Sequence, residues 1–274
     1  MIFSSHAKRW ITGLSLLPLL IFWLGWGNPL MFALLVALAC MAAMWEYFRM
    51  TLGAGTALSH MPLTVVGFIA GLAVLCTAYV NEPWLYVFIL ALNMMAAGFW
   101  VLLRYPSGAS AVQSASFQVQ GVIYIPVLLS SLIYVRSSED GRLWIFFTLV
   151  IVFAGDIGAY YAGSYLGRHK LCPAVSPNKT VEGSAGGLLA NVLAGGIMKA
   201  LLLPSLPWAP CIAMFLCIGA AGQIGDLFES ALKRSVQVKD SGNLLPGHGG
   251  MLDRIDALLF ASPIALIFKK YILG

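Results

Sequence analysis

Long apolar stretches, separated by short polar connections, fill most of this chain. A helix needs about 20 apolar residues to cross the hydrocarbon core of a bilayer. By that criterion the pattern predicts an all-α, polytopic integral membrane protein with about nine membrane-spanning helices. The predicted spans are residues 10–26, 29–47, 61–80, 84–103, 117–135, 143–166, 184–203, 207–228 and 255–273.

The composition agrees with this interpretation. Of the 274 residues, 60% are hydrophobic and only 10% are charged, and the mean hydropathy is +0.87. Soluble domains carry roughly 25% charged residues, so the composition excludes a soluble enzyme, and also a disordered chain or a coiled coil. The five cysteines form no CxxC pair, and we expect them to be buried apolar residues, not a disulfide or metal framework.

The basic residues predict the orientation. Placing the N-terminus, with Lys8 and Arg9, in the cytoplasm satisfies the positive-inside rule. Most of the 16 Lys and Arg residues then lie on the cytoplasmic side. The outer set is Arg136, Arg142, Lys199, Lys269 and Lys270. This topology puts both long polar connections, residues 168–182 and 229–254, in the cytoplasm, where nucleotides are found.

Two parts of the chain are expected to differ in role. Residues 1–142 contain about five spans, and the two long polar connections lie outside them. Residues 143–274 contain both polar connections, and we predict that they form the catalytic region.

Acidic residues inside predicted spans are the first candidates for chemistry. Asp156 lies in the sixth span and Asp226 near the end of the eighth, where a carboxylate costs roughly 2.5–3.5 kcal/mol on insertion scales. Such residues face a cavity or a partner, and a structural bond between helices is the simplest explanation for a lone one. Asp226 shares a helix face with Glu229 and Ser230 because they are three and four residues apart.

A second acidic pair, Asp253 and Asp256, opens the ninth predicted span. Helix N-termini favour negative charge, so helix capping remains an alternative for this pair. Two carboxylate pairs that enter one membrane face from consecutive helices could also converge. Carboxylates together with the phosphates of a nucleotide are the usual environment of Mg²⁺, and we favour a metal site.

Residues 229–254 are the densest polar stretch of the chain. Its cations could be no more than positive-inside anchors, but its glycines allow backbone N–H groups to approach a phosphate closely. Cations, glycines and acids in one segment predict a polyphosphate held through metal. The residues concerned are Lys233, Arg234, Lys239, Gly247, His248, Gly249 and Gly250.

The connection at 168–182 has a similar character. Arg168, His169 and Lys170 are followed by a segment that runs from Ser176 through Asn178 and Lys179 to Gly183. Alone it would be interpreted as a basic turn with a cap on the seventh span. It matters because the predicted topology places it on the same face as residues 229–254.

Small residues recur every four positions along the sixth span, at Gly155, Ala159, Gly163 and Gly167. Such a ridge lets another helix pack very close. Gly183 and Gly187 repeat the spacing at the start of the seventh span. We therefore expect Asp156 to be held in a helix–helix interface.

With these motifs in place, the chain resembles the phosphatidate cytidylyltransferases, also called CDP-diacylglycerol synthases. The resemblance covers roughly residues 150–260 and includes 156–160 and 176–183. Asn178, where relatives often have Lys, and Gln237, where Gly is common, depart from the pattern. The signature residues are Ser230, Lys233, Arg234, Lys239, Asp240, Gly242, Pro246, His248, Gly249, Gly250, Asp253, Arg254 and Asp256.

The resemblance implies an integral-membrane enzyme that joins phosphatidic acid to CTP and releases CDP-diacylglycerol and pyrophosphate. It implies dependence on one or two Mg²⁺ ions, and it allows a second, monovalent ion. It also implies a homodimer among membrane lipids, in the bacterial cytoplasmic (inner) membrane, with no nucleic-acid partner.

Roles can be assigned on this basis. We expect Asp226 and Asp253 to hold metal, with Asp156, Asp256 and Glu229 as further candidates. The catalytic set adds Lys233, Arg234, Lys239 and His248. We expect the substrate phosphates to be bound by Lys179, Ser176, Asn178, Ser230, Gly249, Gly250 and Arg254.

Other functions remain as alternatives. A transporter also carries intramembrane acids and glycine-broken helices, although here the polar groups cluster at one face and no two halves resemble each other. Enzymes that consume CDP-diacylglycerol resemble one another in an Asp-Gly-x-x-Ala-Arg motif. The Asp140-Gly141 pair of this chain is followed by Arg142-Leu143 and does not continue in that pattern. No GxxxxGK[ST] motif supports P-loop chemistry.

Overall fold

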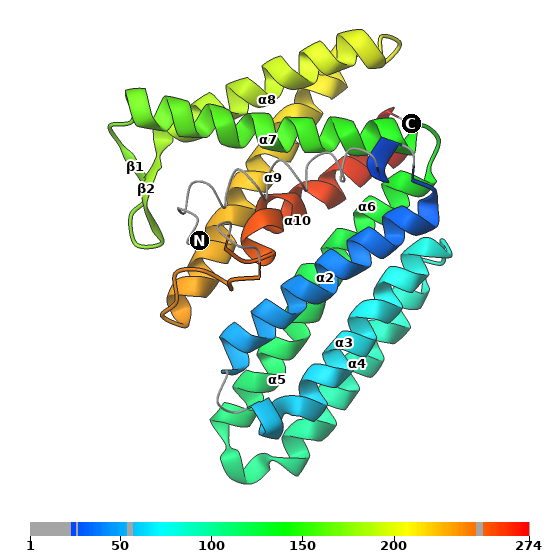
Figure 1. The fold of residues 1–274 in the computed structure, drawn as a ribbon, viewed down its shortest axis with the longest axis vertical. Coiled ribbons are helices and arrows are strands. Elements are labelled where there is room, and N and C mark those ends of the chain that lie inside the picture. Colours follow the sequence, from blue (N-terminus) through cyan, green and yellow to red (C-terminus); the bar gives the residue numbers. More distant parts are fainter. Residues whose placement is uncertain (1–22, 26, 54–56, 245–248, 274) are drawn as a thin grey trace, which may run out of the picture. The chain divides into compact units, whose positions relative to one another are not determined.

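The computed structural model describes residues 23–25, 27–53, 57–244 and 249–273. The chain divides into two compact units, which are described separately below (Figure 1). Unit 1 comprises residues 1–134 and 240–254, and unit 2 comprises residues 135–239 and 255–274. The functional division predicted at residues 142 and 143 stays a prediction.

Unit 1 is built from long helices. Helix α2 (Pro29–Leu52) begins where the Asn28 side chain accepts a hydrogen bond from the N–H of Met31 at 2.8 Å, with Pro29 in the first turn. This is the residue order that favours a helix start. The helices that follow are α3 (Ala57–Tyr79), α4 (Leu85–Leu103), α5 (Ala109–Val122) and α6 (Leu128–Ser137).

A π-helical turn (Ile123–Val127) joins α5 to α6 without a break in the chain's helical path. Pro126 lies in this turn. Proline has no N–H to donate and its ring crowds the preceding turn, which accounts for the wider winding here. The predicted span 117–135 therefore corresponds to one continuous helical segment, residues 109–137.

Unit 2 combines helices with a small hairpin. Helix α7 (Gly141–Leu166) is followed by β1 (Lys170–Cys172), β2 (Ser176–Thr180) and α8 (Val181–Leu202). The two strands pair antiparallel, with Lys170 opposite Thr180 and Cys172 opposite Ser176. Helix α9 (Trp208–Ser235) follows, and α10 (Leu252–Ile267) leads into a π-helical turn (Phe268–Leu273).

The ridge of small residues is the main contact between α7 and α8; the sequence predicted a close helix contact at this ridge but not which helix makes it. A β-carbon at Gly183 would lie 2.9 Å from the carbonyl oxygen of Ala159, and one at Gly187 would lie 2.9 Å from that of Gly155. The backbones of the two helices therefore approach too closely for larger side chains. Asn191 of α8 is 1% exposed and fills the space beside Gly155.

Seven helices in the described part of the chain are long and apolar enough to cross a membrane. They correspond to the second through eighth predicted spans. Most of the first predicted span lies outside the described residues, and the ninth corresponds to α10 and its π-helical extension. The total of nine and the orientation of the N-terminus stay predictions.

The outer surface of these helices suits lipid. Along one face of α8, Leu189, Leu193, Ile197 and Leu201 are between 58% and 73% exposed. An apolar stripe of this kind would be unfavourable in water. With the seven long apolar helices, it makes the protein an integral membrane protein.

Two local features differ from the sequence-based expectation. The connection 168–182, expected as a turn, contains the β1–β2 hairpin. Helix α9 continues to Ser235, past the end of the predicted span 207–228, so Lys233 and Arg234 lie in its last turn. The negative end of the helix dipole favours cations at that place, and falling hydropathy therefore marked the membrane boundary and not the helix end.

Substituting Gly187 by Ala should destabilise unit 2. The added β-carbon would lie 2.9 Å from the Gly155 carbonyl oxygen and 3.0 Å from Nε2 of Gln223, and overpacking of this kind costs about 1–3 kcal/mol. We expect a lower thermal midpoint in detergent. Gly98→Ala on α4 is the matched control, because nothing lies within 4 Å of its β-carbon position; equal midpoints for the two variants would contradict the packing account.

Candidate active site

The hairpin is fixed to the start of α8 by Glu182. One carboxylate oxygen, Oε2, accepts hydrogen bonds from the N–H groups of Arg168 at 3.0 Å and His169 at 3.1 Å. The other, Oε1, lies 2.6 Å from Nδ1 of His169. The Thr180 hydroxyl accepts the N–H of Gly183 and so caps α8. These bonds set where Lys179, the residue before this cap, projects.

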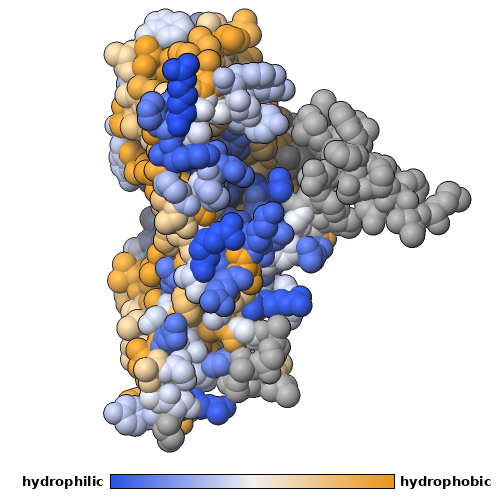
Figure 2. All heavy atoms as spheres, turned by 90° about the vertical axis from the view of Figure 1, so that its left-hand side faces the viewer, coloured by the Kyte–Doolittle hydropathy of each residue, from blue (hydrophilic) through white to orange (hydrophobic). Residues whose placement is uncertain are grey.

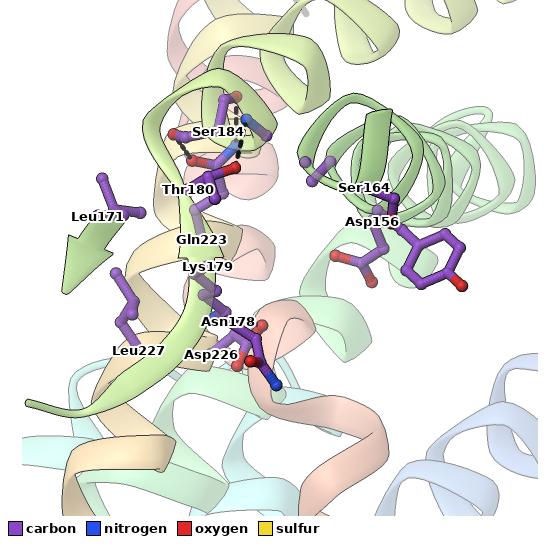
Figure 3. A pocket seen from close by; sticks show the side chains of 14 residues that line it. Asp156, Ser164, Leu171, Asn178, Lys179, Thr180, Ser184, Gln223, Asp226 and Leu227 are labelled. Atoms are coloured by element: carbon purple, nitrogen blue, oxygen red, sulfur yellow. Dashed lines mark hydrogen bonds and ion pairs between the residues drawn. The ribbon is translucent and has the colours of Figure 1, made fainter. Parts of the chain in front are cut away.

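A cavity of about 450 Å³ opens between α7, β2, α8 and α9 within unit 2. Its polar lining includes Asp156 and Tyr160 of α7, Asn178 and Lys179 of β2, and Asp226 of α9. Figure 3 shows Asp156 on α7 across the cavity from Lys179 and Asp226. Figure 2 shows one face of the molecule, on which hydrophilic residues lie close to one another and hydrophobic residues lie beside them.

An ion pair links the hairpin to α9 inside this cavity. Lys179 Nζ lies 2.5 Å from Asp226 Oδ2, and the two side chains are 28% and 36% exposed. Partial exposure leaves both groups reachable from the cavity. A paired cation and anion cost less free energy in an apolar environment than an unpaired charge does.

Gln223, one turn before Asp226, connects α9 to α8. Its Nε2 donates to the carbonyl oxygen of Ser184 at 3.0 Å, and its Oε1 accepts the Ser184 hydroxyl. Both residues line the cavity. This pair of bonds fixes the distance between the helix that follows Lys179 and the helix that carries Asp226.

Further predicted residues lie along the last turns of α9. Glu229 is fully buried and its carboxylate lies 2.5 Å from Nζ of Lys233, four residues on. Arg234 donates from Nε to the carbonyl oxygen of Val175 at 3.4 Å and from Nη1 to that of Val238 at 3.2 Å. Arg234 therefore joins the tip of the hairpin to the end of α9.

Asp253 lies in unit 1, in the first turn of α10. Its Oδ2 accepts the N–H of Gly250 at 2.9 Å, and both of its carboxylate oxygens accept the N–H of Ser241, at 3.2 and 3.3 Å. Gly249 adopts a positive φ of 80°, a conformation that suits glycine. The carboxylate thus organises its own loop, and its assignment to a metal site or to helix capping stays a prediction.

The structure brings together Asp156, Asn178, Lys179 and Asp226 around one cavity. Asp256 belongs to the same unit, where its Oδ1 accepts the N–H of Ala257 at 2.7 Å. Among the described residues no group of three or more His, Cys, Asp and Glu side chains is arranged to hold a metal ion. His248 lies outside the described residues, while Ser176, Ser230, Lys239, Gly249, Gly250 and Arg254 do not line this cavity.

Three residues at or near these sites were not assigned roles from the sequence. Gln223 and Tyr160 both line the cavity, and both belong to apolar stretches where an isolated polar group is unusual. Glu46 is 3% exposed in α2. A single acid that interrupts a long uncharged stretch is a signal that could have found it.

Comparison with known proteins places the chain in a family. The model of the family described as "Cytidylyltransferase family" matches residues 7–272. The chain belongs to the cytidylyltransferase family. This membership agrees with the resemblance seen in the sequence motifs.

Several curated relatives are named phosphatidate cytidylyltransferase. The Bacillus subtilis (strain 168) protein is 43% identical over 148 residues, which cover 54% of this chain and 55% of that protein. The Staphylococcus saprophyticus protein is 34% identical over 205 residues, and the Staphylococcus aureus (strain COL) protein is 33% identical over 207 residues. Each of these two alignments covers 74% of this chain and 78% of the relative.

Replacing Glu182 by Ala should loosen the hairpin. The change removes the acceptor of the Arg168 and His169 N–H groups, and loss of these hydrogen bonds makes local opening of the hairpin easier. We expect hydrogen–deuterium exchange of residues 168–180 to accelerate about tenfold. Glu139→Ala, at an exposed position, is the control, and unchanged exchange in the Glu182 variant would show that the carboxylate does not hold the hairpin.

Proposed function

We propose that this protein acts as a phosphatidate cytidylyltransferase and that the cavity around Lys179 and Asp226 binds the reacting phosphates. The reaction transfers CMP from CTP to phosphatidic acid and gives CDP-diacylglycerol and pyrophosphate. Family membership supports the reaction class. The Lys179–Asp226 pair, placed beside Asp156 in a membrane-embedded unit, is the observation that supports the place.

The reaction requires a cavity that neutralises the negative charge of the phosphates. A phosphate oxygen of phosphatidic acid forms a bond to the α-phosphorus of CTP, and the bond from that phosphorus to the bridging oxygen of the β-phosphate breaks. Pyrophosphate leaves with the electron pair of the broken bond. Such transfers are catalysed mainly by positioning and charge neutralisation, so the chain needs no covalent nucleophile.

Lys179 is the residue best placed to meet the phosphates. In the structure its charge is balanced by Asp226 at 2.5 Å. An incoming polyphosphate competes with that carboxylate for the ammonium group, and the partial exposure of Lys179 lets it respond without a change in the hairpin. Asn178, which also lines the cavity, adds a neutral donor.

The cations at the end of α9 have supporting roles. Arg234 already holds the hairpin tip through the Val175 carbonyl, so we assign it to positioning as well as to phosphate neutralisation. Lys233 is balanced by Glu229, and Lys239 is exposed. Together they raise the positive potential at the face where the substrates approach.

The donor set of the cavity fits Mg²⁺. Asp156 and Asp226 supply carboxylate oxygens to one cavity, and hard oxygen ligands are what Mg²⁺ prefers. We propose that these two residues hold one or two Mg²⁺ ions, with Asp256 as a further ligand and a second, monovalent ion as an addition; metal binding by Asp253 stays a prediction from the sequence. Bound Mg²⁺ would neutralise charge on the attacking and leaving oxygens. The residues of the chain would orient the phosphates and keep Lys179 facing them.

The location of the site follows from the distribution of charge. Most Lys and Arg residues, including those of the hairpin and of the end of α9, are on the predicted cytoplasmic side. We propose that the protein lies in the bacterial inner membrane with its cavity open to the cytoplasm, where CTP is available. A homodimer, implied by the resemblance, is part of the same proposal.

Asp226→Asn should abolish turnover and leave the fold intact. The neutral amide can still contact Lys179 but cannot balance it or hold Mg²⁺, and we expect CDP-diacylglycerol formation to fall by at least about 1,000-fold, in the range for lost charge stabilisation at an active site. Product can be followed with labelled CTP in detergent micelles. Asp140→Asn is the control because Asp140 is exposed, makes no capping bond and has a positive φ that Asn also tolerates. Wild-type rates in the Asp226 variant would refute the proposed site.

A further inference from the structure

Glu46 of α2 makes an unusual long-range contact in unit 1. Its side chain is buried, with 3% of the residue exposed. Oε2 accepts the N–H of Leu252 at 2.9 Å and the hydroxyl of Ser241 at 3.2 Å. These partners come from the opposite end of the sequence. The carboxylate thus joins the second predicted span to the polar segment that precedes α10.

The loop is shaped to receive this carboxylate. A β-carbon at Gly242 would lie 2.6 Å from Glu46 Oε1, and one at Gly250 would lie 2.5 Å from Oε2. Both positions therefore need glycine for the backbone to come close enough. We use the name Asp253 loop for residues 240–244 and 249–254.

The same loop residues hold Asp253. Ser241 gives its hydroxyl to Glu46 and its N–H to the Asp253 carboxylate. Gly250 packs against Glu46 and gives its N–H to Asp253 at 2.9 Å. The two carboxylates therefore lie on either side of one short piece of backbone, and a shift of Glu46 would move the donors that orient Asp253.

Burial of Glu46 is costly to the helix that carries it. Oε1 has no hydrogen-bond partner in the described part of the chain, and a buried polar atom without a partner costs free energy. An apolar side chain would pack in α2 without that cost. The carboxylate is thus better explained by what it does for the Asp253 loop than by the stability of α2.

We propose that Glu46 is a positioning residue that clamps the Asp253 loop and thereby sets the orientation of Asp253. This gives the N-terminal helices a part in catalysis, because α2 supplies the clamp. The effect on turnover rests on the proposed function. The effect on the loop does not.

The test uses full-length protein in detergent micelles and compares wild type with Glu46→Ala, Glu46→Gln and the exposed-site control Glu139→Ala. Hydrogen–deuterium exchange reports on the Asp253 loop and, for reference, on α7 and α8. We expect exchange of the loop to rise at least about 100-fold in Glu46→Ala, as expected for the loss of two hydrogen bonds to a charged acceptor, while α7 and α8 stay unchanged. Glu46→Gln keeps one acceptor oxygen and should lie between Ala and wild type.

The kinetic part separates positioning from binding. We expect kcat to fall about 10- to 100-fold in Glu46→Ala while KM for CTP changes less than threefold, with partial rescue by Gln. If Glu46→Ala does not fold, Ser241→Ala takes its place, because it removes only the hydroxyl that donates to Glu46. We then expect a smaller rise in loop exchange and a smaller fall in kcat than for Glu46→Ala.

Two results would overturn the clamp. One is loop exchange within twofold of wild type in both Glu46→Ala and Ser241→Ala. The other is an equal rise of exchange throughout all helices, which would make Glu46 a general stabiliser. If wild-type protein forms no CDP-diacylglycerol, the proposed function fails by itself, and the exchange data still decide whether Glu46 holds the loop.

Discussion

The ion pair between Lys179 and Asp226 is the contact around which the candidate site of unit 2 is arranged. A chain with so few charges can place a carboxylate in a long apolar helix only where a partner or a polar cavity compensates for it. Lys179 provides that compensation from a hairpin, not from another span, and so the charge of Asp226 stays accessible. The same arrangement gives the cavity a cation that can move from carboxylate to phosphate over a short distance.

The remaining contacts of unit 2 fix this pair in place. Close packing of α7 on α8 through Gly155, Gly183 and Gly187 brings Asp156 to the cavity wall. Glu182 ties the hairpin to α8, and the Gln223–Ser184 bonds tie α8 to α9. Each contact is modest alone, but together they define the separation of the two acids and the lysine, which is what transfer between phosphates requires.

Sequence patterns predicted the second through eighth spans and singled out most of the acidic residues inside them. Both can be recognised from the local sequence alone. Apolar stretches of bilayer length give helices, and an acid inside one is conspicuous. The spacing of small residues likewise predicted a close helix contact along α7, although not that α8 is the partner. Helix α9 extends beyond the predicted span 207–228 because hydropathy reports the membrane boundary, whereas Glu229 and Lys233 continue the helix as a pair four residues apart.

Partners that are distant in the chain could not be found in this way. Nothing local relates Lys179 to Asp226, or Glu46 to Ser241 and Leu252, because each pairing is created by the packing of helices. Capping was recognised as an alternative for Asp253, but the donors that its carboxylate binds, Ser241 and Gly250, depend on the path of the loop. Glu46 was overlooked because a single acid at the end of an apolar stretch also suits a membrane boundary.

The central claim is that this protein transfers a nucleotidyl group to a lipid phosphate. The most direct test incubates purified protein with phosphatidic acid, Mg²⁺ and CTP that carries label on either the α- or the γ-phosphate. We expect α-label to enter the lipid phase while γ-label stays in water as pyrophosphate, and we expect chelation of Mg²⁺ to stop both. Label from the γ-phosphate in lipid, or no lipid label from folded protein with any divalent metal, would contradict it.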